Sequence, residues 1–310
     1  MVKDGKPNFP TRIFVNENLK VGIFGSQSSL GRAFLERVSK SDDRFDIKII
    51  NRKSLLGQNG LFDRPKLFSE LVGLDLILYF SVKNTNNYSP ISRSSFVCSN
   101  VTHPIEVFEV AREARVNRML VFSSNLTVSR LKSWAWLLRL VQPNFLARLY
   151  YAESKKLLEK QVVRISKNPM KNLNTELVCI RMPMIISSAG TRNFRRFLWL
   201  SKSLMFRALL KVTGLRRSVI GGSDCVELLL QLVKSKDFVG TCVVSMSSES
   251  ISLYSLSVAV ANDDNCFRQG GWGNPALFFS DDYDLSKDGK CMLSLSREGS
   301  IGREISALRS

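Results

Sequence analysis

The chain has 310 residues, of which 44% are hydrophobic and 23% are charged. These are ordinary values for a globular protein, so wholesale disorder, collagen and coiled coil are excluded as classes. The length suits one large α/β domain, or such a domain with a small lobe added. No apolar run approaches the roughly 20 residues that span a bilayer, and residues 1–20 lack the apolar core of a secretory signal. We therefore expect a cytoplasmic protein.

The six cysteines are widely scattered without a C-x-x-C pair, and His103 is the only histidine. This pattern predicts neither a metal site nor a disulfide scaffold, and it fits a reducing compartment. We interpret His103 as a structural residue.

The positive charge is concentrated in the middle of the chain. The net charge is 45 − 27 = +18, and residues 129–218 hold 19 Lys/Arg against 3 Asp/Glu, or +16 of it. Two stretches, 131–139 and 194–207, mix basic with large apolar residues. They fit ordinary helices with a solvated basic face, or a helix lying peripherally on an anionic membrane surface. Nucleic-acid binding is disfavoured because no matching motif is present.

Hydrophobic patterning predicts alternating strands and helices through the first two thirds of the chain. The expected strands are 20–24, 46–50, 74–81, 118–122 and 176–181, and the expected helices are 29–40, 65–72, 101–114 and 151–165. Strands separated by such helices form a parallel sheet with right-handed crossovers. After Arg181 the pattern weakens, and only a helix at 224–233 and a strand at 241–245 are predicted.

We therefore predict an α/β fold, a Rossmann-type doubly wound parallel sheet with a small C-terminal substrate lobe. The nucleotide-binding domain would comprise residues 1–183, completed by about 218–245. The lobe would comprise residues 184–217 and 246–310.

A glycine-rich turn joins the first predicted strand to the first helix. It contains Gly25, Ser28, Ser29, Leu30 and Gly31, with serine rather than glycine in the middle position. A dinucleotide site needs a tight turn, a close backbone approach to the pyrophosphate, and close packing of helix on strand. Helix N-terminal amides then hold the phosphates. Read alone, the same residues also fit a simple tight turn.

The second predicted strand ends in Asn51, Arg52 and Lys53. A carboxylate at this place would bind ribose hydroxyls and repel a 2′-phosphate. Two cations favour a 2′-phosphate through charge-assisted hydrogen bonds, so NADP is favoured over NAD. The alternative is that both cations are solvated loop residues.

Tyr151 and Lys155 lie four residues apart, which places them on one face of a helix. A nearby ammonium stabilises phenolate and lowers the pKa of tyrosine. The pair would then act as a general acid and base during hydride transfer. Such pairs are common, but this one follows four β/α units and opens a helix before the next strand.

At this point the chain resembles the extended short-chain dehydrogenase/reductase family, in particular its nucleotide-sugar epimerase/dehydratase group. Seven segments match in the family's order: 21–31, 73–82, 100–101, 116–124, the Tyr151–Lys155 pair, 181–183 and 218–224. The resemblance implies that Phe80, Ser81 and Asn100 border the cofactor. It also implies that Lys155 binds the nicotinamide ribose.

The chain departs from the family pattern after the fourth strand. Asn125 stands where the family has a catalytic Ser or Thr, with Ser124 directly before it. An amide can donate a hydrogen bond but cannot relay a proton as a hydroxyl does. Leu126 and Thr127 replace the acid pair of the dehydratases, which disfavours 4,6-dehydration. Either Ser124 or Asn125 would be the donor to the substrate oxygen.

The resulting hypothesis is an NAD(P)-dependent oxidoreductase or epimerase that acts on a carbinol or keto group of a nucleotide sugar in surface-polysaccharide biosynthesis. Arg192, Arg195 and Arg196 could bind the substrate diphosphate, or they could form a solvated helix face. The resemblance further implies a homodimer. The alternative hypothesis is a catalytically idle NADP-binding scaffold or sensor whose basic face contacts a membrane or protein.

Overall fold

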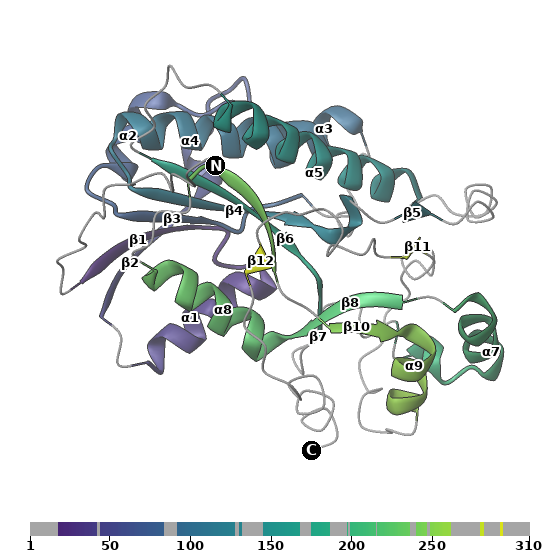
Figure 1. The fold of residues 1–310 in the computed structure, drawn as a ribbon. Helices are drawn as coiled ribbons and strands as arrows, with labels where there is room; N and C mark the ends of the chain where they lie inside the picture. The colour runs from purple at the N-terminus through teal and green to yellow at the C-terminus, as the bar shows by residue number, and fades with distance from the viewer. Residues whose placement is uncertain are drawn as a thin grey trace, which may run out of the picture.

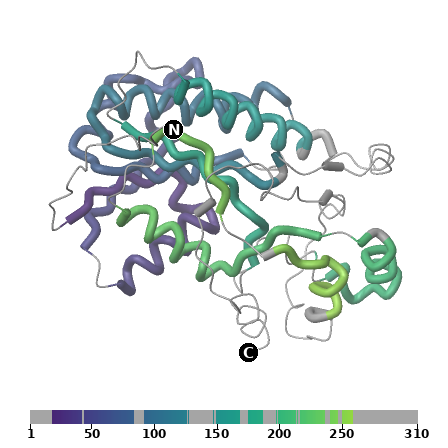
Figure 2. Tube along the Cα trace, in the orientation of Figure 1, coloured from purple at the N-terminus to yellow at the C-terminus, as the bar shows by residue number. Residues whose placement is uncertain are grey.

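The computed structural model places helices on both faces of a parallel sheet and sets a smaller sheet beside it (Figures 1 and 2). None of the helices in the described part of the chain is long and apolar enough to cross a membrane. The structure describes residues 18–41, 44–83, 92–127, 130–131, 145–167, 175–186, 197, 199–214, 216–235, 240–246, 249–261, 280–281 and 292–293.

The main sheet has seven strands in the order β12-β9-β6-β4-β3-β1-β2, and every neighbouring pair is parallel. Its strands are β1 (Leu19–Phe24), β2 (Phe45–Ile50), β3 (Leu76–Tyr79), β4 (Arg118–Ser124), β6 (Glu176–Met182), β9 (Cys242–Met246) and β12 (Met292–Leu293). The chain reverses direction across the sheet between β1 and β3. In open α/β sheets this switch point, at the carboxyl ends of the strands, is where ligands bind.

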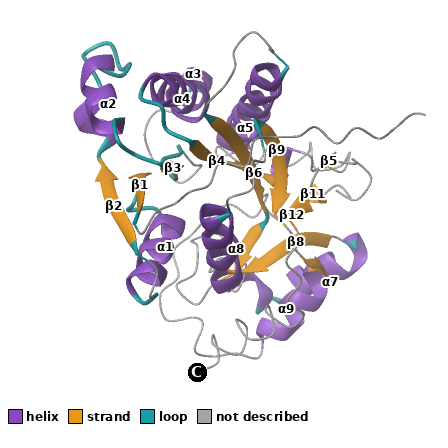
Figure 3. Cartoon of the chain, turned by 60° about the vertical axis from the view of Figure 1, so that its left-hand side comes forward, coloured by secondary structure: helices purple, strands orange, loops and turns teal. Residues whose placement is uncertain are grey.

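Helices cover both faces of this sheet (Figure 3). On one face lie α1 (Ser29–Ser39) and α8 (Gly222–Lys234), whose apolar residues join one core cluster. On the other lie α2 (Arg64–Leu71), α4 (His103–Glu113) and α5 (Phe145–Ser166), which build the second cluster. The doubly wound architecture predicted from the sequence is therefore confirmed.

Strand β1 shows why both faces of the main sheet are buried by helices. Val21 and Ile23 face the cluster of α1 and α8, whereas Phe24 faces the cluster of α2, α4 and α5. All three side chains are fully buried. Successive strand residues point to opposite faces, so an uninterrupted apolar strand is typical of a sheet that is covered on both sides.

The strands and helices predicted from the sequence are observed with ends that differ by at most two residues, with one exception. Helix α5 begins at Phe145, six residues before the predicted start. The predicted helix at 101–114 is α4, which continues without a break from α3 (Arg93–Val97) and a π-helical turn, η2 (Cys98–Thr102).

A smaller sheet, β10-β8-β7, lies beyond the main one with two helices beside it. These elements are β7 (Met184–Ile186), α7 (Leu204–Thr213), β8 (Arg216–Gly221), β10 (Glu249–Ser252) and α9 (Leu253–Ala261). The patterning did not predict the strands of this sheet, and of its helices it indicated only the basic, apolar stretch 194–207, which overlaps the start of α7. A further ribbon pairs β5 (Arg130–Leu131) with β11 (Ser280–Asp281).

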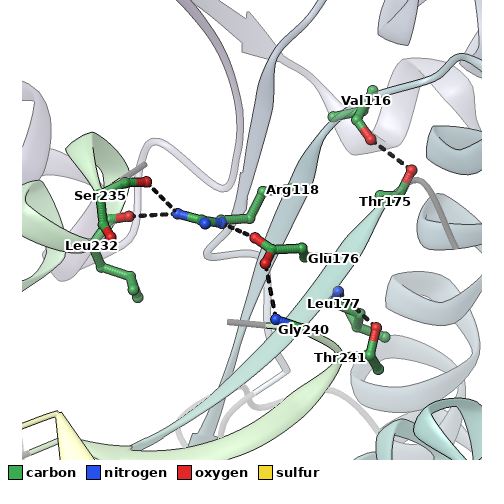
Figure 4. A network of polar contacts seen from close by, with 9 residues as sticks. All are labelled: Val116, Arg118, Thr175, Glu176, Leu177, Leu232, Ser235, Gly240 and Thr241. Atoms are coloured by element: carbon green, nitrogen blue, oxygen red, sulfur yellow. Dashed lines mark hydrogen bonds and ion pairs between the residues drawn. The ribbon is translucent and has the colours of Figure 1, made fainter. Parts of the chain in front are cut away.

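A buried ion pair joins the amino ends of β4 and β6 (Figure 4). Arg118 Nε donates to Glu176 Oε2, and Arg118 Nη1 donates to the carbonyls of Leu232 and Ser235 at 3.0 and 2.9 Å. The other oxygen, Glu176 Oε1, accepts from the Gly240 amide at 2.9 Å. The pair thus ties the end of α8 and the segment before β9 to the centre of the sheet.

We predict that Arg118→Met lowers the free energy of unfolding by about 3–5 kcal/mol, because Glu176 would remain charged and buried without its partner. The double variant Arg118→Met/Glu176→Leu should recover part of this loss. Urea unfolding measures both. The matched control is Lys40→Met, which removes an ion pair with Glu36 whose side chains are 67% and 68% exposed. A loss no larger in Arg118→Met than in Lys40→Met would contradict the prediction.

Candidate active site

The turn between β1 and α1 is closed by two glycines that have no room for a side chain. Gly25 has φ of +78°, and a Cβ there would lie 2.6 Å from the backbone nitrogen of Ser81. A Cβ at Gly31 would lie 2.7 Å from the carbonyl oxygen of Gly25. Ser28 is the N-cap of α1, and its Oγ accepts from the Gly31 amide at 3.0 Å. The turn therefore brings the start of α1 directly over the ends of β1 and β3.

The start of α1 fits a phosphate group. The amides of Ser29 and Leu30 belong to the helix N-terminus, where N–H groups lack helical acceptors and the helix dipole favours an anion. The first turn of α1 contains no acidic residue that would repel one. The Leu30 side chain instead packs against the core, so only its backbone is available to a ligand. The predicted residues are thus brought together in a form that suits a dinucleotide.

The two cations after β2 occupy different surroundings. They begin a short 3₁₀ helix, η1 (Arg52–Leu55), in which Asn51 Oδ1 accepts from the Lys53 amide at 3.1 Å. Lys53 is exposed and Arg52 is half-buried. The Arg52 guanidinium lies near Tyr79, where it opposes the burial that raises the pKa of that phenol to about 12.

The Tyr79 phenol lies in the core, and Arg52 and Ser81 beside it lower its pKa against the effect of burial. The fit to a nicotinamide dinucleotide therefore depends on the β1–α1 turn. Its two glycines leave no room for a side chain beneath the start of α1, which is the close backbone approach that a pyrophosphate needs.

Two of the residues predicted to border the cofactor, Phe80 and Asn100, use their side chains for contacts within the protein. The Phe80 ring is buried and stacks on Phe122 with 4.8 Å between ring centroids, so only its backbone faces the turn. Asn100 is also buried, and it bonds Lys83 N at 2.8 Å, Lys83 O at 3.0 Å and Ser154 Oγ at 3.0 Å. Asn100 thus holds the segment after β3 against α5, and both of its amide hydrogens are already donated within the protein. Ser81 is half-buried and borders Gly25.

The structure favours Ser124 over Asn125 as the hydroxyl partner of Tyr151. Ser124 ends β4, and its side chain lies close enough to the Tyr151 phenol to lower the pKa of that phenol. Asn125 begins a 3₁₀ turn, η3 (Asn125–Thr127), and is buried with no hydrogen bond to either side-chain atom. The hydroxyl that the family pattern places one residue later is therefore supplied here by the preceding residue.

Lys155 lies one helical turn after Tyr151 on α5, and its side chain is almost completely buried. Its Nζ lies 5.7 Å from the centroid of the Tyr151 ring and donates to the Phe122 carbonyl at 2.6 Å. Burial lowers the pKa of Lys155 to about 8, which the carboxylate of Glu159 partly opposes. The predicted pair therefore does share one helix face.

The expected lowering of the Tyr151 pKa is wrong for the protein without ligand. Tyr151 is half-buried, and desolvation raises the pKa of its phenol to about 12, against a smaller lowering by the nearby Ser124 side chain. The Lys155 ammonium donates to a backbone carbonyl and not to the phenol. Burial penalises the phenolate more than the distant cation stabilises it.

Sequence reasoning missed Glu159, which connects the surrounding elements. Its carboxylate accepts from Ser123 Oγ at 2.6 Å and Thr127 Oγ1 at 3.0 Å. It also forms a two-point ion pair with Arg181, with Nε to Oε1 at 3.0 Å and Nη2 to Oε2 at 2.7 Å. The available signal was its position, one helical turn after Lys155 on the same face.

His103 is buried, as its structural interpretation requires. Its Nε2 lies 2.9 Å from the Gly60 carbonyl, and burial lowers the pKa of the imidazole. Arg192, Arg195 and Arg196, predicted to bind the substrate diphosphate, lie outside the described residues.

No protein-family model matches the sequence, and no curated protein matches it. Solved structures share the fold. A GDP-D-glycero-L-gluco-heptose synthase from Campylobacter jejuni, solved in the presence of NADPH, superposes with a TM-score of 0.63 at 14% identity, over 96% of this chain and 98% of that one. A UDP-N-acetylglucosamine 4-epimerase from Methanobrevibacter ruminantium, in complex with UDP-N-acetylmuramic acid, gives 0.61 at 13% identity, over 94% and 96%.

MoeE5, in complex with UDP-glucose and NAD, gives a TM-score of 0.60 at 12% identity, over 93% of this chain and 97% of that one. Such neighbours are nucleotide-sugar epimerases and dehydratases of the extended short-chain dehydrogenase/reductase type. The predicted resemblance is therefore confirmed for the fold.

We predict that Gly25→Ala destabilises the protein by clearly more than Gly60→Ala. Both glycines have positive φ, at +78° and +75°, so both variants incur the strain of a left-handed alanine, about 1 kcal/mol. Only at Gly25 does the added Cβ also meet backbone, since nothing lies within 4 Å at Gly60. Thermal unfolding compares the two variants. Equal losses would mean that the contact with Phe80 and Ser81 does not constrain the turn.

We predict that the Tyr151 phenol does not ionise near pH 10 in the folded protein, because its pKa is raised to about 12. The near-ultraviolet absorbance of phenolate measures this in the wild type and in Tyr151→Phe. The folded proteins should give the same signal, whereas in urea the variant should lack one of six phenolates. Since the folded protein keeps the proton longer, Tyr151 should lower stability as pH rises from about 10 to about 12. A phenolate missing from the folded variant near pH 10 would contradict the assignment.

Proposed function

We propose that the chain is an NAD(P)-dependent oxidoreductase or epimerase that acts on a carbinol or keto group of a nucleotide sugar. The observation that carries this proposal is the grouping of Tyr151, Lys155 and Ser124 at the carboxyl end of β4, with Lys155 Nζ 5.7 Å from the Tyr151 ring centroid. This group lies on the sheet whose β1–α1 turn fits a dinucleotide phosphate. The nucleotide sugars named for the structural neighbours, such as UDP-glucose, support the substrate class.

Each residue then has a definite role. The start of α1 would bind the cofactor pyrophosphate, with Arg52 and Lys53 beside the adenosine ribose. A bound nicotinamide would supply or accept a hydride at the substrate carbon. Tyr151 would exchange the proton of the substrate oxygen, while Ser124 would donate a hydrogen bond to the same oxygen. The Lys155 side chain would bind the nicotinamide ribose.

Tyr151 keeps its proton at neutral pH, as a tyrosine with a pKa of about 10 or higher does. It can therefore donate that proton to a carbonyl oxygen when a keto-sugar is reduced. Oxidation of a carbinol by the same residue requires the phenolate, which a nearby cation must stabilise.

We propose NADP as the preferred cofactor, because two cations and no carboxylate follow β2. Neighbours occur both with NAD and with NADPH, so the comparisons support the nicotinamide without selecting its phosphate. A role in surface-polysaccharide biosynthesis in the cytoplasm, and a homodimer, are further parts of this proposal. They rest on the resemblance of the sequence alone.

The test is turnover of keto-sugar nucleotides with UDP, GDP and ADP carriers in the presence of NADPH or NADH. Absorbance at the nicotinamide band follows net reduction. Product analysis by nuclear magnetic resonance in heavy water detects epimerisation, which consumes no cofactor overall. Tyr151→Phe should lower turnover by about 10²- to 10⁴-fold, as loss of a general acid does, and should still bind NADPH.

Ser124 and Asn125 provide a matched pair of variants. Ser124→Ala should lower turnover by about 10²-fold, because a hydrogen-bond donor to the reacting oxygen is lost. Asn125→Ala should leave turnover nearly unchanged, since neither amide atom has a partner. Binding of NADPH without turnover across the whole panel would instead favour the idle scaffold or sensor. Two observations are compatible with a scaffold or sensor. The Tyr151 phenol stays protonated, and neither side-chain atom of Asn125 has a hydrogen-bond partner.

A further inference from the structure

Helix α7, beside the smaller sheet, carries a surface feature that is separate from the Tyr151 site (Figure 1). It begins after its N-cap Ser203 and ends at Gly214, whose φ of +59° turns the chain back. Its inner side is anchored by Phe206 and Leu210, both buried, with the Phe206 ring meeting Phe197 edge-on at 6.2 Å. Figure 1 shows α7 beside α9 at the outer end of the smaller lobe.

The outer side of α7 is apolar and exposed. Leu204, Met205, Leu209 and Val212 are 75%, 82%, 41% and 86% exposed. Their spacing of one, four and three residues places them on one face of the helix. Trp199, in the preceding helical turn, is 51% exposed. We call these five residues the α7 apolar face. The other large apolar side chains exposed in the described residues lie elsewhere in the chain: Ile49, Leu61, Phe68, Val72, Val163 and Val258.

The charged residues of this segment are basic. Lys202 and Lys211 are exposed and Arg207 is half-buried, and the helical spacing sets Arg207 and Lys211 along one edge of the face. Between Glu176 and Asp224 the sequence contains nine Lys/Arg and no Asp or Glu. An apolar helix face on a basic segment matches the surface of an anionic bilayer.

We propose that the α7 apolar face docks the protein on an anionic membrane surface. The ten residues of α7 make a helix about 15 Å long, too short to span a bilayer but sufficient to lie in its interface. Met, Leu and Val would enter the acyl boundary, and Trp199 would lie at headgroup depth, where tryptophan is enriched. The long stems of the exposed Lys202 and Lys211 would let their charges reach the phosphates, with Lys211 Nζ lying 5.8 Å from the centroid of the Tyr254 ring.

A second copy of this chain fits the face less well. A symmetric contact through α7 would bring two basic edges together, and like charges facing each other at an interface are unfavourable. Lipid headgroups have the opposite charge and need no shaped groove. Docking through α7 does not depend on the proposed reaction, so loss of either leaves the other standing.

The test is cosedimentation of the full-length protein with vesicles of phosphatidylcholine alone or mixed with phosphatidylglycerol. The wild type should bind the anionic vesicles more tightly, and added salt should weaken the binding. Met205→Ser/Val212→Ser should reduce the binding about tenfold or more, because two apolar side chains no longer leave water. Lys202→Gln/Lys211→Gln should reduce it by a smaller factor.

The matched control is Ile49→Ser/Val72→Ser, which removes two apolar side chains that are 59% and 53% exposed but lie away from α7. It should bind anionic vesicles as the wild type does, and circular dichroism should be unchanged in all variants. Equal binding to both kinds of vesicle, or an equal loss in the control, would overturn the proposal. So would a wild-type oligomer that Met205→Ser/Val212→Ser converts to monomer with vesicle binding unchanged, since the face would then join two copies.

Discussion

The candidate active site depends on the buried ion pair between Glu159 and Arg181. Glu159 belongs to α5 and Arg181 to β6, and the same carboxylate accepts from Ser123 at the end of β4 and from Thr127 in η3. Because Lys155 and Tyr151 precede Glu159 on α5 by one and two helical turns respectively, this contact also fixes them over the end of β4. The Glu159 carboxylate further opposes the desolvation that lowers the pKa of Lys155. Glu159 therefore affects both the position of Tyr151 and Lys155 and the protonation of Lys155.

The same two strands carry a second buried ion pair at their other end. Arg118 of β4 stands opposite Glu176 of β6 in the parallel register that also pairs Ser123 with Arg181. A buried pair need not be more stabilising than apolar residues of the same volume, but loss of one partner leaves a charge in the core. The Arg118–Glu176 pair therefore favours one register of β4 against β6. That register brings Ser124, at the end of β4, to Tyr151.

Tyr151 and Ser124 show how far a family pattern can be applied to this chain. The pattern places the third polar residue at Asn125, and the sequence left Ser124 and Asn125 as alternatives. The side chain of Ser124 reaches the phenol, while Asn125 is buried without a partner. Backbone geometry at the start of η3 decides between the two neighbours, and no composition or spacing rule contains that geometry. In the same way Asn100, expected at the cofactor, is used to hold α5 against the segment after β3.

The sequence by itself determined the order of strands and helices in the main sheet, the glycines of the β1–α1 turn and the Tyr151–Lys155 spacing. These are local properties, because hydrophobic period, turn chemistry and helical repeat are visible in neighbouring residues. Only the tertiary structure decided the smaller sheet, the partners of Glu159 and the raised pKa of Tyr151. Each of these depends on residues far apart in the chain, and desolvation in particular depends on what surrounds a group in space. For the α7 apolar face, the spacing of the apolar residues is visible in the sequence. Only the tertiary structure shows that their side chains are exposed and not packed in the core.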